Sequence, residues 1–224
     1  MPKQRKPQPR PAMPTLVVFL LDKSGSMMDG YSATIEAFNG FKNGLRETPK
    51  LKMSLVQFCT VSVLQSYTNL DILEVPDLTP ETYRIGGGTP LVDATYKTIM
   101  ATQDALKSMM NGTKVVFCIQ TDGEENASRE HTNDQLKLLI EQCQGYGWQF
   151  NFMGAGINSF HQSRKWGISD EQSISYDSSQ PNMVRETFFA NAHNTSAYAS
   201  GLVGNTNYSA VQRMKSGDKF YGKV

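Results

Sequence analysis

The feature that most constrains this sequence is an alternation of short apolar runs with longer segments of helical periodicity. The run TLVVFLL covers residues 15–21 and is bounded by turn residues, and similar runs cover residues 115–119 and 149–153. Runs of this length without polar alternation are typical of strands buried on both faces. Because such strands alternate with helices, we predict an α/β fold with a doubly wound, mostly parallel central sheet and helices on both faces.

The segments between the apolar runs carry their apolar residues at helical intervals. Ile35, Phe38 and Phe41 lie on one face of a predicted helix over residues 31–46. Further helices are predicted over residues 91–110, 132–146, 157–166 and 181–200. Two neighbouring strands at 53–58 and 61–66 suggest a hairpin, residues 67–85 read as a long connection, and residues 173–176 as a last short strand.

Composition divides the chain into three parts. Residues 1–14 form a basic, Pro-rich leader that we expect to be a disordered, solvated spacer, residues 15–200 form the folded domain, and residues 201–224 form a polar, loosely held tail. The leader carries four basic residues of a chain with net charge +1, so the remainder is net negative. That remainder lacks a basic footprint for nucleic acid.

Neither a membrane span nor a disulfide framework is predicted. The longest apolar run is far shorter than the ~20 residues that a membrane helix requires. The leader resembles a secretory signal only in its positive charge, because no apolar stretch follows before Leu16, and we therefore expect a cytoplasmic protein. The widely spaced Cys59, Cys118 and Cys143 are expected to be buried free thiols.

The residues that carry chemistry follow the ends of predicted strands. Asp22, Ser24 and Ser26 form D-x-S-x-S directly after the first strand, and residues at i, i+2 and i+4 of an extended turn can point the same way. Thr89 follows three glycines in GGGTP, and Asp122 follows another strand in TDGEE. Carboxylate and hydroxyl oxygens suit a hard divalent ion such as Mg²⁺. Because the carboxyl ends of parallel strands meet at one edge, these groups are expected to converge there.

With these three motifs in this order, the sequence resembles the von Willebrand factor A family, over residues 15–200. The resemblance implies a doubly wound sheet with a metal-ion-dependent adhesion site at its top. It implies that Ser24, Ser26 and Thr89 contact the metal, while Asp22 and Asp122 act directly or through water. The cofactor would be a divalent cation, Mg²⁺ before Mn²⁺ or Ca²⁺. The compact layout is closer to bacterial and phage-encoded members than to animal adhesion proteins, an analogy at the level of fold.

The function expected from this site is metal-dependent protein binding without catalysis. A cation that keeps an exchangeable position can take an Asp or Glu carboxylate from a protein partner. One alternative is an assembly subunit of a larger complex or particle whose metal site is not essential. Another is a metal-dependent hydrolase or phosphotransferase with Asp22 as nucleophile, but no second Asp follows two residues on and no His lies near the motifs. The glycines before Thr89 do not form a phosphate loop, since G-x-x-x-x-G-K-[ST] is absent.

Overall fold

The computed structural model of the protein describes residues 13–109 and 112–222. The predicted leader therefore lies outside the described residues except at its last two positions. In chain order the described elements are β1 (Thr15–Asp22), η1 (Gly25–Gly30), α1 (Tyr31–Gly44), β2 (Leu51–Phe58), β3 (Val63–Asp71), α2 (Leu91–Leu106), β4 (Lys114–Thr121), α3 (Asn133–Gly145), β5 (Gln149–Ala155), α4 (Ser159–Lys165), η2 (Asp170–Gln172), β6 (Ser173–Tyr176), α5 (Pro181–Ala199) and α6 (Ala210–Ser216).

These elements form a doubly wound α/β fold, as the alternation of runs and helices predicted. The strands make one sheet in the order β3-β2-β1-β4-β5-β6. β1 is parallel to both of its neighbours, β2 and β4. β5 is parallel to β4, and β6 is parallel to β5. In the register, Asp22 lies opposite Phe58, and Leu21 lies opposite Gln120. The carboxyl ends of β1, β2 and β4 therefore lie together at one edge of the sheet.

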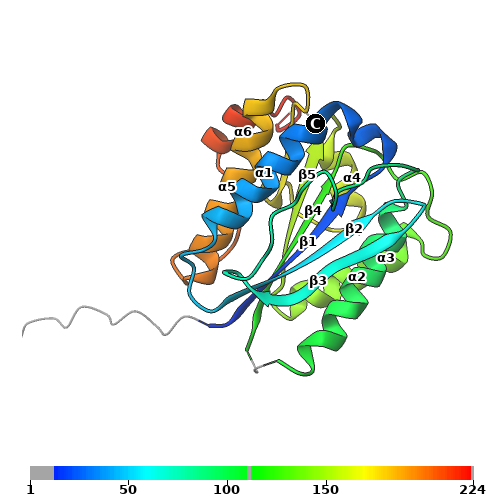
Figure 1. Ribbon diagram of the computed structural model, residues 1–224. Coiled ribbons are helices and arrows are strands. Elements are labelled where there is room, and N and C mark those ends of the chain that lie inside the picture. The colour runs from blue at the N-terminus through cyan, green and yellow to red at the C-terminus, as the bar shows by residue number, and fades with distance from the viewer. Residues whose placement is uncertain (1–12, 110–111, 223–224) are drawn as a thin grey trace, which may run out of the picture.

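Helices cover both faces of the sheet. Figure 1 shows α1 and α5 on one side, and α2 and α3 on the other. Strand β1 is fully buried, with Phe19 in the cluster on the α1 and α5 side and Leu20 in the cluster on the opposite side. The Phe19 ring lies 5.2 Å from the Phe38 ring and 5.8 Å from the Phe188 ring, measured between centroids. This two-sided burial explains why β1 has a continuous apolar run instead of alternation.

The hairpin formed by β2 and β3 is antiparallel, as predicted, but β3 is longer than expected. It continues to Asp71, whereas the sequence indicated a connection from Tyr67 onward. β3 is an edge strand with mostly exposed side chains, such as Gln65, Ser66 and Thr68. An edge strand exposed on one face needs no apolar pattern, so polarity was a poor indicator of a loop here.

The segment after Gly201 differs from the loosely held tail that its polar sequence suggested. It contains α6, which begins with a capping box at Ser209 and packs beside α5 (Figure 1). Thr206 and Ser216 are fully buried, and Arg213 is 3% exposed. The segment is held by buried polar contacts, which a search for apolar periodicity does not detect.

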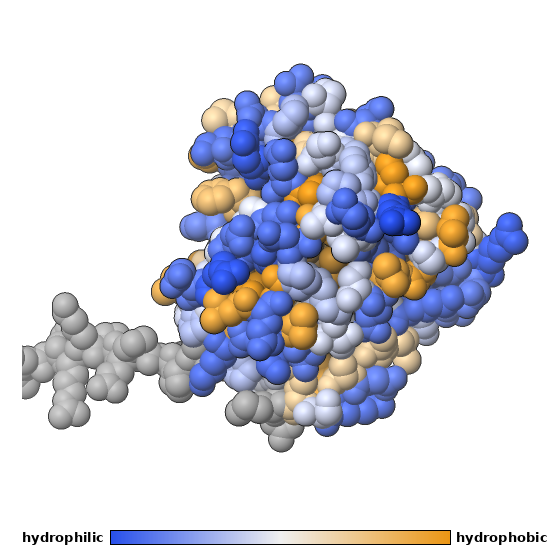
Figure 2. All heavy atoms as spheres, in the orientation of Figure 1, coloured by the Kyte–Doolittle hydropathy of each residue, from blue (hydrophilic) through white to orange (hydrophobic). Residues whose placement is uncertain are grey.

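The face of the molecule drawn in Figure 2 is mainly hydrophilic, and its apolar residues lie in several small groups separated by polar ones. Within the described ranges, no helix has the length and apolar character needed to cross a bilayer. The three cysteines are free and buried, as predicted.

Candidate metal centre

Three loops meet at the carboxyl edge of β1 and β4. Asp22 is the last residue of β1, and the chain then enters η1 at Gly25. Asp122 directly follows β4, the neighbour of β1. Thr89 comes one residue before the Pro90 that precedes α2. The parallel register thus places these loops, which lie far apart in the sequence, at the same point of the fold.

Asp22 lies at the base of the site and has no exposed surface. Its Oδ1 accepts a hydrogen bond from the backbone N–H of Ser24 at 2.7 Å, and its Oδ2 accepts one from the Thr121 hydroxyl at 2.6 Å. Its backbone carbonyl accepts a hydrogen bond from the Tyr83 hydroxyl at 2.5 Å. Asp22 is therefore held from three directions, and neither carboxylate oxygen is without a partner.

The outer part of the site is a chain of short polar contacts. The Ser24 and Ser26 hydroxyl oxygens lie 3.1 Å apart, and the Ser26 hydroxyl donates to Oδ1 of Asp122 at 2.7 Å. Ser24 is buried, Asp122 is half-buried and Ser26 is exposed. The oxygen atoms thus run from the base of the site to the surface, where another molecule can reach them.

Thr89 lies next to the TDG turn and completes the group. A Cβ added at Gly123 would lie 3.1 Å from Oγ1 of Thr89 and 3.8 Å from Oγ of Ser26. Both hydroxyls therefore border the same glycine. The backbone N–H of Thr89 donates to Oδ1 of Asn126 at 2.9 Å, which links the GGGTP loop to the loop after β4. Thr89 is almost fully buried.

The glycines before Thr89 are needed for close backbone contact. Gly87 has a φ of +76°, and a Cβ there would lie 2.5 Å from Oγ1 of Thr60. Its carbonyl accepts a hydrogen bond from the N–H of Gly25 at 2.9 Å. A side chain at Gly87 would push the GGGTP loop away from the D-x-S-x-S turn, so this glycine allows the two loops to meet.

No protein-family model and no curated protein matches the chain. Solved structures do. The VWA domain of SpRpn10 has 15% sequence identity and a TM-score of 0.54, with 85% of this chain and 99% of that one covered. The vWF domain of Mfa5, the type V pili tip protein of Porphyromonas gingivalis, has 10% identity and a TM-score of 0.60, with 82% and 95% covered.

The chain has a von Willebrand factor A-type fold. A third similar structure, proximal thread matrix protein 1 from the mussel byssus, has 11% identity and a TM-score of 0.59 over 81% of this chain. This chain spans only 48% of the length of that protein. At such low identities the likeness concerns the fold, and the chemistry at its edge has to be argued from the residues themselves.

In this VWA-type fold the edge carries two perturbed acids. Burial raises the pKa of Asp22 to about 6, against the lowering effect of the hydrogen bonds from Thr121 and Ser24, and the charge of Asp122 makes a smaller contribution to this rise. Burial also raises the pKa of Asp122, and the hydrogen bond from Ser26 acts in the opposite direction by lowering it. Ionising both acids together is therefore costly, and a cation beside them would remove much of that cost.

The donor set is rich in hydroxyls. Across residues 13–109 and 112–222, no three His, Cys, Asp or Glu side chains gather in a metal-binding arrangement. The VWA-type edge instead offers three hydroxyls and two carboxylates, all of them oxygen donors. Such a set suits hard cations and not zinc, which prefers nitrogen and sulfur.

Sequence reasoning missed several supporting residues. The Thr121 hydroxyl bonds Asp22, and its position next to Asp122 at a strand end was the available signal. Tyr83 is fully buried, although it lies in a segment that read as a polar connection. Glu125, in the TDGEE segment, accepts hydrogen bonds from the N–H groups of Val92, Ala127 and Ser128. It fastens the loop after β4 to the start of α2.

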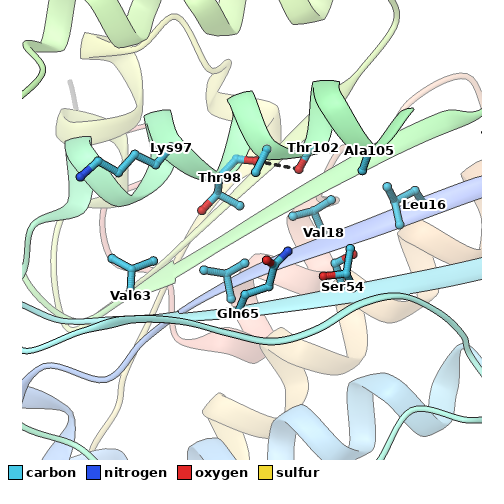
Figure 3. Close-up of a pocket in the computed structure, with 12 residues that line it drawn as sticks. Leu16, Val18, Ser54, Val63, Gln65, Lys97, Thr98, Thr102 and Ala105 are labelled. Carbon is cyan, nitrogen blue, oxygen red and sulfur yellow. Dashed lines mark hydrogen bonds between the residues drawn. The ribbon is translucent and has the colours of Figure 1, made fainter. Parts of the chain in front are cut away.

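The two methionines of η1 differ in their exposure. Met27 is buried and lines the hollow beside Ser26 and Asp122, whereas Met28 is 64% exposed. A hollow of about 260 Å³ opens beside the site and is lined by Ser26 and Asp122, among others. A separate hollow between α2 and the β2–β3 hairpin is lined by Val18, Gln65 and Thr98, with no residue of the candidate centre (Figure 3).

Proposed function

We propose that this protein is a metal-dependent protein-binding module that holds one divalent cation at the edge of its sheet. Ser24, Ser26 and Thr89 would hold the ion together with Asp22 and Asp122. The observation that carries the proposal is the continuous contact from Asp22 through Ser24 and Ser26 to Asp122, with the Thr89 hydroxyl beside it. A VWA-type fold supports an interaction role in general, and the metal dependence rests on these contacts.

The residues present fit such an ion. Hydroxyl and carboxylate oxygens are the ligands that Mg²⁺ prefers, and Mn²⁺ or Ca²⁺ accept the same donors. Both oxygens of Asp22 already accept hydrogen bonds, which favours an outer role in which this acid supplies charge and orients the turn. Ser26 and Asp122 lie nearer the surface and border the hollow, so they form the part of the site that a partner would meet.

Partner recognition would use charge. When bound, the cation supplies a positive centre that can take the carboxylate of an Asp or Glu from a protein partner. The exposed position of Ser26 leaves that centre open to solvent. The carboxylate of the half-buried Asp122 would lower the net positive charge of the ion-bound site. The bond between the cation and a partner's carboxylate would therefore stay reversible.

The contacts favour binding over catalysis. His131 contacts Asp93 and His193 contacts Asn194, and among the described residues no hydrogen bond joins a histidine to Ser24 or Ser26. The Lys23 amine donates to the Ser62 hydroxyl at 2.8 Å and so is engaged away from Asp22. A cytoplasmic location and a bacterial or phage origin remain predictions from the sequence.

The test is capture of partners from native extract in Mg²⁺ and in chelator. We expect partners that are retained in Mg²⁺, released by chelator and lost with Ser24→Ala/Ser26→Ala. Ser108→Ala is the matched control, because this exposed serine bonds, among the residues that the structure describes, to Ala105 in its own turn. Retention in chelator would overturn the proposal in favour of an assembly subunit. Turnover of a phosphate ester that Asp22→Ala abolishes would favour an enzyme instead.

A further inference from the structure

The hollow of about 260 Å³ beside the candidate metal centre is enclosed by parts of the chain that lie far apart in the sequence. Its polar lining comes from η1, the first turn of α1, the residue after β4, and the end of β6 with the segment that follows it. The residues are Ser26, Asp29, Thr34, Asp122, Tyr176 and Ser178. Ser26 and Asp122 also belong to the candidate centre, so the two sites share a border. A partner that reaches the cation would therefore also meet the hollow.

The hollow is acidic. The exposed Asp29 and the half-buried Asp122 both line it, whereas none of its lining residues is basic. Among the described residues, Asp29 has neither a hydrogen-bond partner nor an ion-pair partner. Burial is the main cause of the raised pKa of Asp122, and the charge of Asp29 raises it as well, so the two carboxylates repel each other. The hollow therefore carries negative charge that no lining side chain balances.

A buried hydroxyl without a partner lines the same hollow. Thr34 lies in the first turn of α1 and is 2% exposed. Its hydroxyl makes no hydrogen bond with any residue that the structure describes. A buried hydroxyl without a partner costs free energy. Thr34 is therefore placed to bond a group that enters the hollow from outside the chain.

The rest of the lining and the size of the hollow suit one long side chain. Met27, Ala155 and Val184 are buried apolar residues of the lining. Lysine and arginine pack their methylene stems on such surfaces, while the charged end keeps polar partners. The volume lies below the ~300–1,000 Å³ of typical small-molecule sites. The hollow thus fits a single side chain of a larger partner better than a whole small molecule.

A cation at the centre would not balance the charge once a partner is bound. Asp22, Asp29 and Asp122 supply three negative charges when ionised, against two positive charges on a divalent ion. The partner's carboxylate would add another negative charge next to them. Neighbouring charges of one sign disfavour binding, and a positive charge on the same partner would offset that cost.

We propose that the hollow lined by Asp29, Thr34 and Asp122 receives a basic side chain of the partner, a lysine or an arginine, beside the acid that binds the cation. The inference rests on the proposed function, because the cation-bound acid brings the basic side chain to the hollow. The feature that this protein recognises is then an acid and a base that are neighbours on the partner. A partner with the acid alone would bind the same centre more weakly.

The experiment uses short blocked peptides as probes in saturating Mg²⁺. The basic probes are acetyl-Lys-Glu-amide, acetyl-Glu-Lys-amide and acetyl-Lys-Ala-Glu-amide, together with their arginine counterparts, and each is compared with the same peptide carrying glutamine in place of the basic residue. Binding is followed by NMR chemical shifts of the whole chain. We expect the best basic peptide to bind wild type about fivefold more tightly than its glutamine counterpart.

Two variants and one control assign that preference to the hollow. Asp29→Asn removes a charge from the lining, and we expect it to abolish the preference. Gly30→Ala keeps the charge but narrows the hollow, because its Cβ would lie 3.7 Å from Oγ1 of Thr34, and we expect it to reduce the preference. Glu36→Gln is the matched control, since this exposed acid on α1 lies outside the lining, and it should leave the preference unchanged.

Calorimetric titration of Mn²⁺ separates this inference from the proposed function. If wild type binds Mn²⁺ and takes basic and glutamine peptides equally, the inference is overturned and the proposed function stands. Two Mn²⁺ ions per chain, one of them lost in Asp29→Asn, would also overturn it, because the hollow would then hold a second cation. If wild type binds no Mn²⁺, the proposed function is refuted and the inference falls with it.

Discussion

Replacing Asp22 by Asn should stabilise the metal-free protein at neutral pH. Asp22 is fully buried, and burial raises its pKa from 3.8 to about 6. The folded state then binds more protons than the unfolded chain between about pH 4 and pH 6. Stability from this group is therefore highest below pH 4, falls as pH rises through that window, and is lowest above pH 6.

The size of the effect follows from the same shift. A pKa raised from 3.8 to about 6 corresponds to about 3 kcal/mol in the free energy of unfolding above pH 6. An amide at this position removes the buried charge, and its oxygen can still accept from the N–H of Ser24. In chelator at pH 7 we expect Asp22→Asn to raise the melting temperature by about 5 to 10 °C.

The assay is thermal unfolding followed by circular dichroism in chelator, for wild type and Asp22→Asn at several pH values from 4 to 7.5. The stability difference between the two proteins should grow as pH rises through 4 to 6 and vanish near pH 4. Comparing the two proteins at each pH cancels the contribution of other acids to the pH dependence of stability. Asp170 is one such acid, because the hydrogen bond from Arg164 lowers its pKa. A variant that is less stable than wild type at pH 7, or a difference independent of pH, would refute the reasoning.

Three further predictions concern the loops around the site and the ion itself. In denaturant unfolding, Gly87→Ala should lower the free energy of unfolding by about 2 kcal/mol, because Gly87 has a positive φ and an added Cβ would lie 2.5 Å from Thr60. The control Gly86→Ala has open space around its Cβ and should change the free energy of unfolding little. Glu125→Gln should cost about 2 kcal/mol in the same assay, because its amide would face N–H donors, whereas the exposed Glu124→Gln should change stability by less than about 0.5 kcal/mol. Mn²⁺ affinity measured by calorimetry should fall as pH drops through 6, because protons compete with the cation for Asp22. An affinity that is independent of pH from 5 to 7.5 would count against a role of Asp22 in holding the ion.

Much of the fold follows from periodicity alone. β1 and β4 are buried on both faces, and their continuous apolar runs identified them directly. β3 was only partly identified, because an exposed edge strand carries no apolar pattern. α6 was missed because its main anchor is a charged residue, Arg213, which a sequence pattern places on the surface.

The candidate site was predictable where its residues follow buried strands. The positions of Asp22 and Asp122 were fixed by the ends of β1 and β4, and Thr89 was identified from the three flexible glycines before it. The roles of Thr121 and Glu125 were not visible, since they depend on contacts between loops far apart in the sequence. The sequence indicates which residues carry oxygen atoms at an edge, but only the packed fold shows which of them hold the others in place.

The most direct test of the central claim is anomalous diffraction from crystals of the protein grown with Mn²⁺. The account predicts one strong peak within bonding distance of the Ser24 and Ser26 hydroxyls, bordered by Thr89 and Asp122. A peak elsewhere on the surface, or none at this edge at saturating Mn²⁺, would contradict it.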